Sequence, residues 1–130
     1  MIMCKVSIIV PVYNVERFIG RCAKSLMEQT LQDVEYIFVN DAATDGSMQV
    51  LSSVLAEYAN RNVHILEHTK NKGLPAARNT GLMAATGEYV YHCDSDDYME
   101  RDMLEVLYEK AKDTQADIVW CDWFLTFEQN

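Results

Sequence analysis

The chain has 130 residues, of which 49% are hydrophobic, and its formal net charge at pH 7 is −9. This length corresponds to one domain, and the hydrophobic content is sufficient for a packed core, which excludes a disordered segment. The negative charge argues against a nucleic acid as partner, because binding to a phosphate backbone requires a basic face.

Strands and helices are predicted to alternate along the whole chain. Near-continuous apolar runs predict strands buried on both faces, and apolar residues at helical spacing predict helices with one buried face. In chain order, we predict strands over 5–12, 34–39, 63–66, 88–93 and 118–121. The predicted helices between them cover 15–28, the residues that follow the turn at 44–47 as far as 58, 74–85 and 103–111. This alternation is typical of the α/β class, with a mostly parallel twisted sheet and helices on both faces.

The last residues predict an unfinished element. Residues 123–127 have the composition of another strand, yet a domain of this class is not expected to finish there. We therefore expect the sequence to be the N-terminal part of a longer protein. For Trp120 and Trp123, packing in the core is favoured over lining an acceptor site.

The sequence favours a cytoplasmic location. No apolar run approaches the ~20 residues of a membrane span. No signal peptide is expected, because Lys5 follows four residues and the apolar run after it already has the pattern of a strand. The four cysteines (Cys4, Cys22, Cys93 and Cys121) form no C-x-x-C pair, which favours buried free thiols over a zinc site or disulfides. Free thiols fit a reducing compartment.

An acidic cluster directly follows the predicted strand over 88–93. Asp94, Asp96 and Asp97 are separated only by Ser95. Neighbouring carboxylates repel one another, and their burial is costly unless a cation or a donor compensates. Oxygen ligands without His or Cys suit Mg²⁺ or Mn²⁺, which keep open positions for phosphate oxygens. The cluster predicts a metal site for a phosphorylated substrate, although a role for Asp97 in capping the following helix or turn is favoured modestly over metal binding.

Other polar residues follow the first and second predicted strands. Ligands of open parallel sheets bind at the carboxyl ends of the strands. Tyr13 is placed to stack on a base, with a core aromatic as the alternative, and Asp41 is placed to accept a hydrogen bond from a base N–H. Arg78 suits a phosphate because its planar fork binds oxygens bidentately, and its alternative is a solvated residue paired with an acid. The three histidines, His64, His68 and His92, show no metal-ligand spacing, so structural or surface roles are favoured for all of them.

Five motifs occur in a characteristic order. They are V-S-I-I-V-P-V-Y-N at 6–14, S-L-M-E-Q-T at 25–30, V-N-D-A-A-T-D-G-S at 39–47, N-K-G-L-P-A-A-R-N-T-G at 71–81, and T-G-E-Y at 86–89 leading into D-S-D-D-Y at 94–98. With these motifs, nearly the whole chain resembles the N-terminal, nucleotide-sugar-binding half of a family 2 glycosyltransferase. Order and spacing together make the resemblance specific.

The resemblance implies the GT-A fold, a Rossmann-like nucleotide-diphospho-sugar transferase fold, and a set of site residues. Pro11, Tyr13 and Asp41 would hold the base, usually uracil, Arg78 would lie near the diphosphate, and Asp94 would face the ribose or sugar. The expected substrate-binding residues are Pro11, Tyr13, Asn14, Asp41, Arg78, Asp94 and Ser95, and the expected metal ligands are Asp96 and Asp94. The chain departs from the family at 40–43, where Asn-Asp-Ala-Ala stands in place of the frequent Asp-Asp-Gly-Ser.

The resemblance also implies the reaction. A Mn²⁺- or Mg²⁺-dependent, inverting enzyme would transfer a sugar from a nucleotide-diphosphate sugar, typically a UDP-sugar, to a hydroxyl of a glycan or lipid-linked acceptor. It would act in cell-surface polysaccharide biosynthesis at the cytoplasmic side, with peripheral association at the inner face of the membrane. Residues 1–130 would form the donor part, whereas the acceptor half, with the catalytic base, would lie beyond residue 130.

Two other functions remain open from the residues. One is a nucleotide- or metal-binding module without catalysis. The other is a sugar nucleotidyltransferase, which would require a glycine-rich phosphate loop after the first strand. Residues 13–17 contain no glycine, which disfavours the second alternative.

Overall fold

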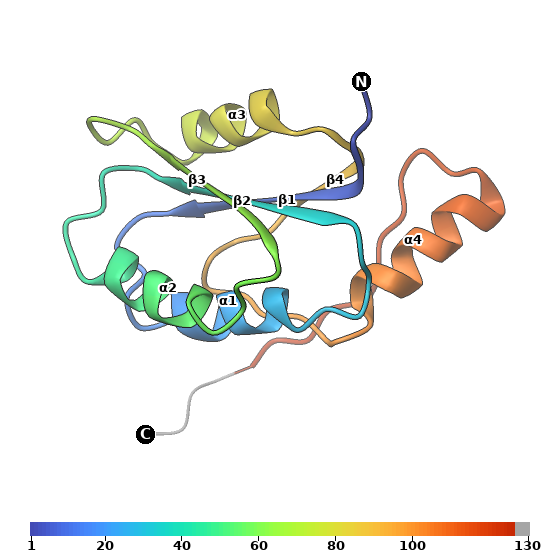
Figure 1. The fold of residues 1–130 in the computed structure, drawn as a ribbon, viewed down its shortest axis with the longest axis horizontal. Helices are drawn as coiled ribbons and strands as arrows, with labels where there is room; N and C mark the ends of the chain where they lie inside the picture. The colour runs from blue at the N-terminus through green and yellow to red at the C-terminus, as the bar shows by residue number, and fades with distance from the viewer. Residues whose placement is uncertain (127–130) are drawn as a thin grey trace.

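The computed structural model describes residues 1–126 and shows a parallel sheet between helices (Figure 1). The strand order is β3-β2-β1-β4, and every pairing is parallel. The predicted α/β class is therefore confirmed. The strands are β1 (Cys4–Val12), β2 (Val34–Asn40), β3 (Asn62–Glu67) and β4 (Gly87–His92), and the helices are α1 (Ile19–Met27), α2 (Ser47–Leu55), α3 (Leu74–Ala84) and α4 (Met103–Thr114).

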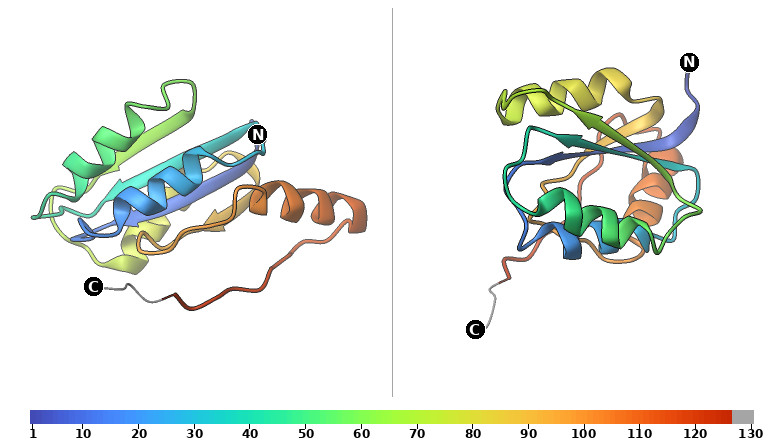
Figure 2. Two further views of the ribbon diagram at one scale, coloured as in Figure 1. Left: turned by 90° about the horizontal axis from the view of Figure 1, so that it is seen from below. Right: turned by 60° about the vertical axis from the view of Figure 1, so that its left-hand side comes forward.

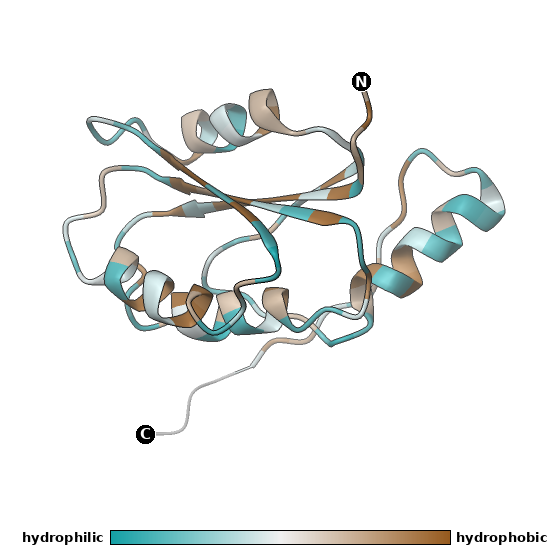
Figure 3. Ribbon diagram, viewed as in Figure 1, coloured by the Kyte–Doolittle hydropathy of each residue, from teal (hydrophilic) through white to brown (hydrophobic). Residues whose placement is uncertain are grey.

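Helices cover both faces of the sheet. Figure 1 shows α1 and α2 on one face and α3 on the other. The larger core cluster joins β1 and β2 to α1, with Leu51 of α2 and Leu104 of α4, and the smaller one packs Ile37 and Val39 against Ala77 of α3. Figure 3 shows hydrophobic colour along the strands and hydrophilic colour on most of the connecting loops. The continuous apolar runs of β1 and β2 follow from this burial on two faces.

The first helix begins later than predicted. Residues 15–18 form a turn and α1 starts at Ile19. The backbone N–H of Val15 donates to Ser47 Oγ (2.8 Å), and that of Glu16 donates to Asp45 Oδ2 (3.2 Å). These tertiary hydrogen bonds replace the first helical turn, and they join the loop after β1 to the start of α2.

The predicted strand over 118–121 is wrong. Residues 118–126 form neither helix nor strand, and Figure 2 shows them as an extended segment that runs back along the molecule. A strand needs a partner for its backbone groups, and this segment makes no ladder with β4. Trp120 and Trp123 have exposed fractions of 82% and 79%, so the expected core packing of both side chains is also wrong. The prediction for Phe127 lies outside the described residues.

Three of the four cysteines fit the prediction. Cys4, Cys22 and Cys93 are buried free thiols, whereas Cys121 is exposed because it lies on the segment after α4. None of the helices in residues 1–126 has both the length and the apolar character needed to cross a bilayer.

All four strands end at the same rim of the sheet, and the backbone stays ordered past the strand ends. The N–H of Asp41 donates to the carbonyl of Val12, and the N–H of His68 donates to the carbonyl of Asn40, each at 2.9 Å. In the same way, the N–H of Cys93 donates to the carbonyl of Ile9 (2.9 Å). The residues that follow β2, β3 and β4 are therefore held in register with the sheet.

Candidate functional site

A cavity of about 440 Å³ lies at this rim. Its volume is within the range of small-molecule sites, roughly 300–1,000 Å³. Six of the predicted site residues line it: Pro11, Tyr13, Asp41, Asp94, Ser95 and Asp96. The sequence analysis did not name as site residues the other five lining residues, Val15, Asn71, Gly73, Leu74 and Ala77.

Tyr13 lies at the cavity with 46% of its surface exposed, so the alternative of a core aromatic is wrong. Its neighbour Asn14 has a left-handed backbone (φ 51°) and does not line the cavity. The Asn14 amide donates to Thr44 Oγ1 (3.1 Å), and its carbonyl oxygen accepts from the Thr44 N–H (2.9 Å). Asn14 therefore joins the loop after β1 to the loop after β2, next to Tyr13, which lines the cavity.

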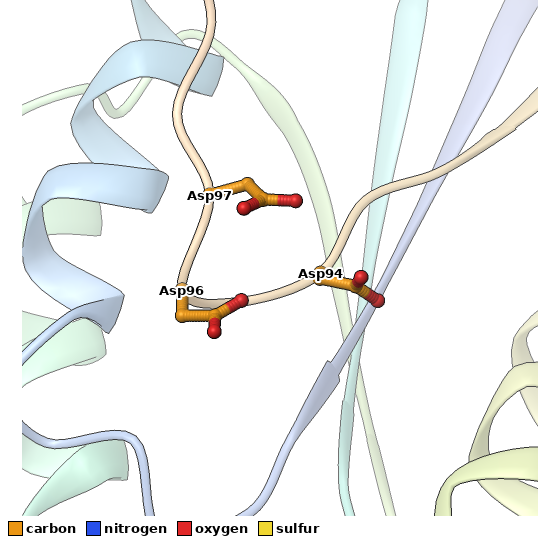
Figure 4. A group of neighbouring side chains, drawn as sticks. All are labelled: Asp94, Asp96 and Asp97. Atoms are coloured by element: carbon orange, nitrogen blue, oxygen red, sulfur yellow. The ribbon is translucent and has the colours of Figure 1, made fainter. Parts of the chain in front are cut away.

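The three carboxylates of the acidic cluster share one short loop between β4 and α4 (Figure 4). Asp94, Asp96 and Asp97 each offer an oxygen, and these oxygens all lie within 4.8 Å of one another. Burial raises the pKa of Asp97, and the charges of Asp96 and Asp94 raise it further. Asp97 does not cap a helix, because α4 begins only at Met103. Three carboxylate oxygens this close together repel one another and fit a divalent cation.

Arg78 of α3 pairs with the acidic cluster. Its guanidinium donates to Asp94 Oδ1 at 2.9 Å, so the pairing with an acid that was the alternative for Arg78 is present, and the acid is one of the predicted ligands. The Arg78 Nε is buried and makes no hydrogen bond. Arg78 thus places a positive charge beside the acids, although it does not itself line the cavity.

Asp41 is buried, with an exposed fraction of 2%, and its carboxylate accepts four hydrogen bonds. The donors are His68 Nδ1 (2.8 Å), the Lys72 N–H (2.8 Å), the Gly73 N–H (2.9 Å) and Asn71 Nδ2 (3.1 Å). Burial raises the pKa of Asp41, but the hydrogen bonds from His68, Lys72 and Gly73 outweigh it and lower the pKa overall. The ionised carboxylate thus anchors the turn over 71–73 that forms one wall of the cavity.

The backbone turns at Gly73 and Ala42 have signals in the sequence, whereas the role of His68 has none. Gly73 has φ 93°, a left-handed conformation that favours glycine, and N-K-G is a recognisable turn signal. Ala42, where the family frequently has glycine, also has a positive φ of 58°. His68 had no signal, because its partners come from β2 and α3.

An open parallel sheet with a cavity and an acidic cluster at its carboxyl rim defines an α/β domain whose candidate site lies where ligands of such sheets bind. The sequence model of glycosyl transferase family 2 matches residues 7–130, and the chain belongs to that family. The GT-A expectation is confirmed by solved structures of similar fold.

Three similar proteins illustrate the relationship. The uncharacterized glycosyltransferase EpsJ of Bacillus subtilis is 47% identical over 120 residues, which cover 92% of this chain and 34% of that protein. A TarS structure from S. aureus in complex with UDP has a TM-score of 0.79 and 31% identity, and the match covers 87% of this chain and 33% of that one. The mannosyltransferase PcManGT of Pyrobaculum calidifontis, in complex with GDP-Man and Mn²⁺, has a TM-score of 0.73 and 31% identity, covering 78% of this chain and 30% of that one. The chain therefore spans about a third of the length of these relatives.

Proposed function

We propose that the chain carries the donor site of a metal-dependent glycosyltransferase that uses a nucleotide-diphosphate sugar, with UDP as the nucleotide. The observation that carries the proposal is one cavity lined by the exposed Tyr13 and by Asp94 and Asp96, two of the three clustered carboxylates, with Arg78 hydrogen-bonded to Asp94. The UDP in the similar TarS structure and the GDP-Man and Mn²⁺ in PcManGT support it.

Each group has a role that its surroundings support. Tyr13 offers its ring to the base, and Pro11 and the Asp41 wall bound the base pocket. Asp96 and Asp94 would hold Mn²⁺ or Mg²⁺, and Arg78 would bind diphosphate oxygens next to them. The bound metal would supply Lewis-acid stabilisation of the negative charge on the departing nucleotide.

We further propose that an acceptor hydroxyl attacks the anomeric carbon in line, with inversion, and that its base lies outside residues 1–130. The acceptor is a glycan or lipid-linked glycan of the cell surface. Buried free thiols support a reducing, cytoplasmic compartment, and a lipid-linked acceptor would bring the protein to the inner face of the membrane.

A thermal-shift screen tests the donor site. UDP, UDP-sugars, GDP-mannose and ADP are each added with and without Mn²⁺. A ligand that binds only the folded state stabilises it by about 2.7 kcal/mol at 100 times its Kd. We expect the largest rise in Tm with a UDP-sugar plus Mn²⁺, and a smaller rise without the metal. The absence of a shift with every nucleotide would overturn the proposal.

A transfer assay separates a transferase from a binding module without catalysis. The full-length protein that contains this chain is incubated with the donor found in the screen and with a lipid-linked glycan acceptor. Formation of a sugar–acceptor product supports the transferase. Donor binding with no product from any acceptor would favour the non-catalytic module.

A further inference from the structure

We propose that His68 is a positioning residue of the donor site, which ties the Asp41 carboxylate to helix α3 and thereby holds the 71–73 turn in the shape that recognises the nucleoside. This inference rests on the proposed function and adds a residue that has no place among the predicted site residues. It concerns recognition of the nucleoside part, not of the diphosphate or the metal.

His68 is built into the rim of the sheet. Its side chain is 5% exposed, and its backbone N–H donates to the carbonyl of Asn40 (2.9 Å). One ring nitrogen, Nδ1, lies 2.8 Å from Asp41 Oδ1, and the other, Nε2, lies 2.7 Å from Thr80 Oγ1. Because an ionised carboxylate only accepts hydrogen bonds, Nδ1 carries a hydrogen. The ring thus connects the end of β2 to the middle of α3.

The connection continues to the cavity through Asp41. A carboxylate has about four lone-pair sites, and His68 fills one while Asn71, Lys72 and Gly73 fill the others. The last three donors belong to one turn that leads into α3 through its N-cap residue Gly73, whereas His68 ties the carboxylate to a second point further along the helix, at Thr80. Asp41, Asn71 and Gly73 line the cavity. His68 therefore acts on the ligand only through the groups that it orients.

The same three groups have the connectivity of a hydrolase triad, in which a carboxylate orients an imidazole that contacts a hydroxyl. Access argues against a nucleophile here, because neither His68 nor Thr80 lines the cavity. Thr80 Oγ1 also lies 3.0 Å from the carbonyl oxygen of Ala76, one turn earlier in α3. The hydroxyl is an anchor on the helix, and the imidazole is a strut between the helix and the carboxylate.

His68 makes no direct hydrogen bond to the acidic cluster. Within the described residues, the hydrogen bonds of His68 go to Asn40, Asp41 and Thr80, and none goes to the loop over 94–97. Loss of the imidazole should therefore impair binding of a nucleoside diphosphate much more than binding of inorganic diphosphate with Mn²⁺. A general loss of structure would impair both.

Calorimetry on a set of variants tests the inference, with UDP plus Mn²⁺ and inorganic diphosphate plus Mn²⁺ as the two probes. His68→Gln keeps an amide group, which can donate or accept, near the position of Nε2 and removes the bond to Asp41, whereas His68→Asn places an amide nitrogen near the position of Nδ1 and keeps that bond. We expect His68→Gln to weaken UDP binding about tenfold, the effect of one lost charge-assisted hydrogen bond. His68→Asn should restore most of the affinity, and diphosphate binding should stay unchanged in both. The matched control is His64→Gln on β3, an exposed histidine that does not line the cavity.

Each outcome of the calorimetry either supports or overturns the positioning role of His68. Equal UDP affinity of wild type and His68→Gln, or an equal loss for UDP and for diphosphate, overturns the positioning role while leaving the proposed function intact. Failure of the wild type to bind any nucleotide overturns the proposed function and this inference with it. If His68→Gln does not fold, Thr80→Val decides instead, because it removes only the anchoring hydroxyl. A loss of UDP affinity that Thr80→Ser restores supports the strut, and unchanged affinity in Thr80→Val overturns it.

Discussion

Asp41 and Asp94 are carboxylates of one cavity in opposite electrostatic surroundings. Asp41 is buried and saturated by four donors, whereas Asp94 is exposed and has one arginine beside two further acids. Hydrogen bonds stabilise the charge of the first, whereas Arg78, and a divalent cation where one binds, would offset the repulsion around the second. The two carboxylates therefore suit different tasks, one holding the wall of the cavity and the other binding metal.

Metal binding should depend on Asp96. Asp96→Asn removes one charge and keeps the shape, and we expect Mn²⁺-dependent UDP binding to weaken about tenfold or more, because even partners that only orient a ligand contribute that much. Calorimetry with UDP and Mn²⁺ measures the loss. Asp102→Asn, an exposed acid outside the cluster, is the control. Unchanged metal-dependent affinity in Asp96→Asn would exclude Asp96 as a ligand.

The ring of Tyr13 should contribute to base binding. Stacking of a base on an aromatic side chain is worth ~1–3 kcal/mol, which corresponds to roughly 5- to 150-fold in Kd. Tyr13→Ala should lose this affinity for UDP, and Tyr13→Phe should keep it. Titrations with UDP and with inorganic diphosphate provide the measurement. An equal loss for both ligands in Tyr13→Ala would contradict stacking.

At the scale of elements, a second buried carboxylate ties three strands together at the opposite rim of the sheet. Glu35 of β2 accepts hydrogen bonds from Ser7 Oγ of β1 and from the N–H and hydroxyl of Thr86, directly before β4. Burial raises the pKa of Glu35, but the bonds from Ser7 and Thr86 outweigh it and lower the pKa overall. The central strands are therefore joined by a charge as well as by the backbone ladder.

Stability should depend on pH through Glu35. Because the folded-state pKa is lowered, this contribution is present above the unfolded-state pKa of about 4.3 and is lost as pH falls through the folded-state value. Glu35→Gln should lower the free energy of unfolding at pH 7 by about 1–3 kcal/mol. Urea denaturation at several pH values should show that the difference in free energy of unfolding between the wild type and Glu35→Gln becomes smaller below pH ~4. Glu109→Gln, at an exposed position, is the control. A difference in free energy of unfolding that stays constant with pH would contradict the stabilising role of the Glu35 charge.

Helix α3 packs on β1 at a glycine. A Cβ added at Gly81 would collide with Ile9 Cγ2, so Gly81→Ala should destabilise the fold by about 1–3 kcal/mol, the usual cost of overpacking. Chemical denaturation measures the change. In Gly20→Ala of α1 the added Cβ would meet Val50 at 3.3 Å, a milder contact, and the gain in helix propensity of up to ~1 kcal/mol should offset it. Equal effects of the two substitutions would show that the α3 contact is not tight.

At the scale of the whole molecule, the segment after α4 exposes a row of large apolar side chains. Ile118, Trp120, Trp123, Phe124 and Leu125 are all mostly exposed. Contiguous exposed apolar surface of this kind favours association.

The purified 130-residue chain should therefore self-associate. Light scattering is expected to show a weight-average mass that rises with concentration. The double substitution Trp120→Ser and Trp123→Ser should lower that mass without changing UDP affinity, because neither residue lines the cavity. A monodisperse monomer at all concentrations would contradict this prediction.

Sequence by itself determined the alternation of elements, the parallel class and the acids at the strand ends. These features depend on local periodicity and on the rule that parallel strands end together, as with Asp94 after β4 and Asp41 after β2. Tertiary structure alone decided the partners. The pairs Arg78–Asp94 and His68–Asp41 join residues of different elements, and local pattern carries no information on such contacts. The same reason explains the wrong strand over 118–121, since its apolar residues satisfied the local rule but no neighbouring strand paired with them.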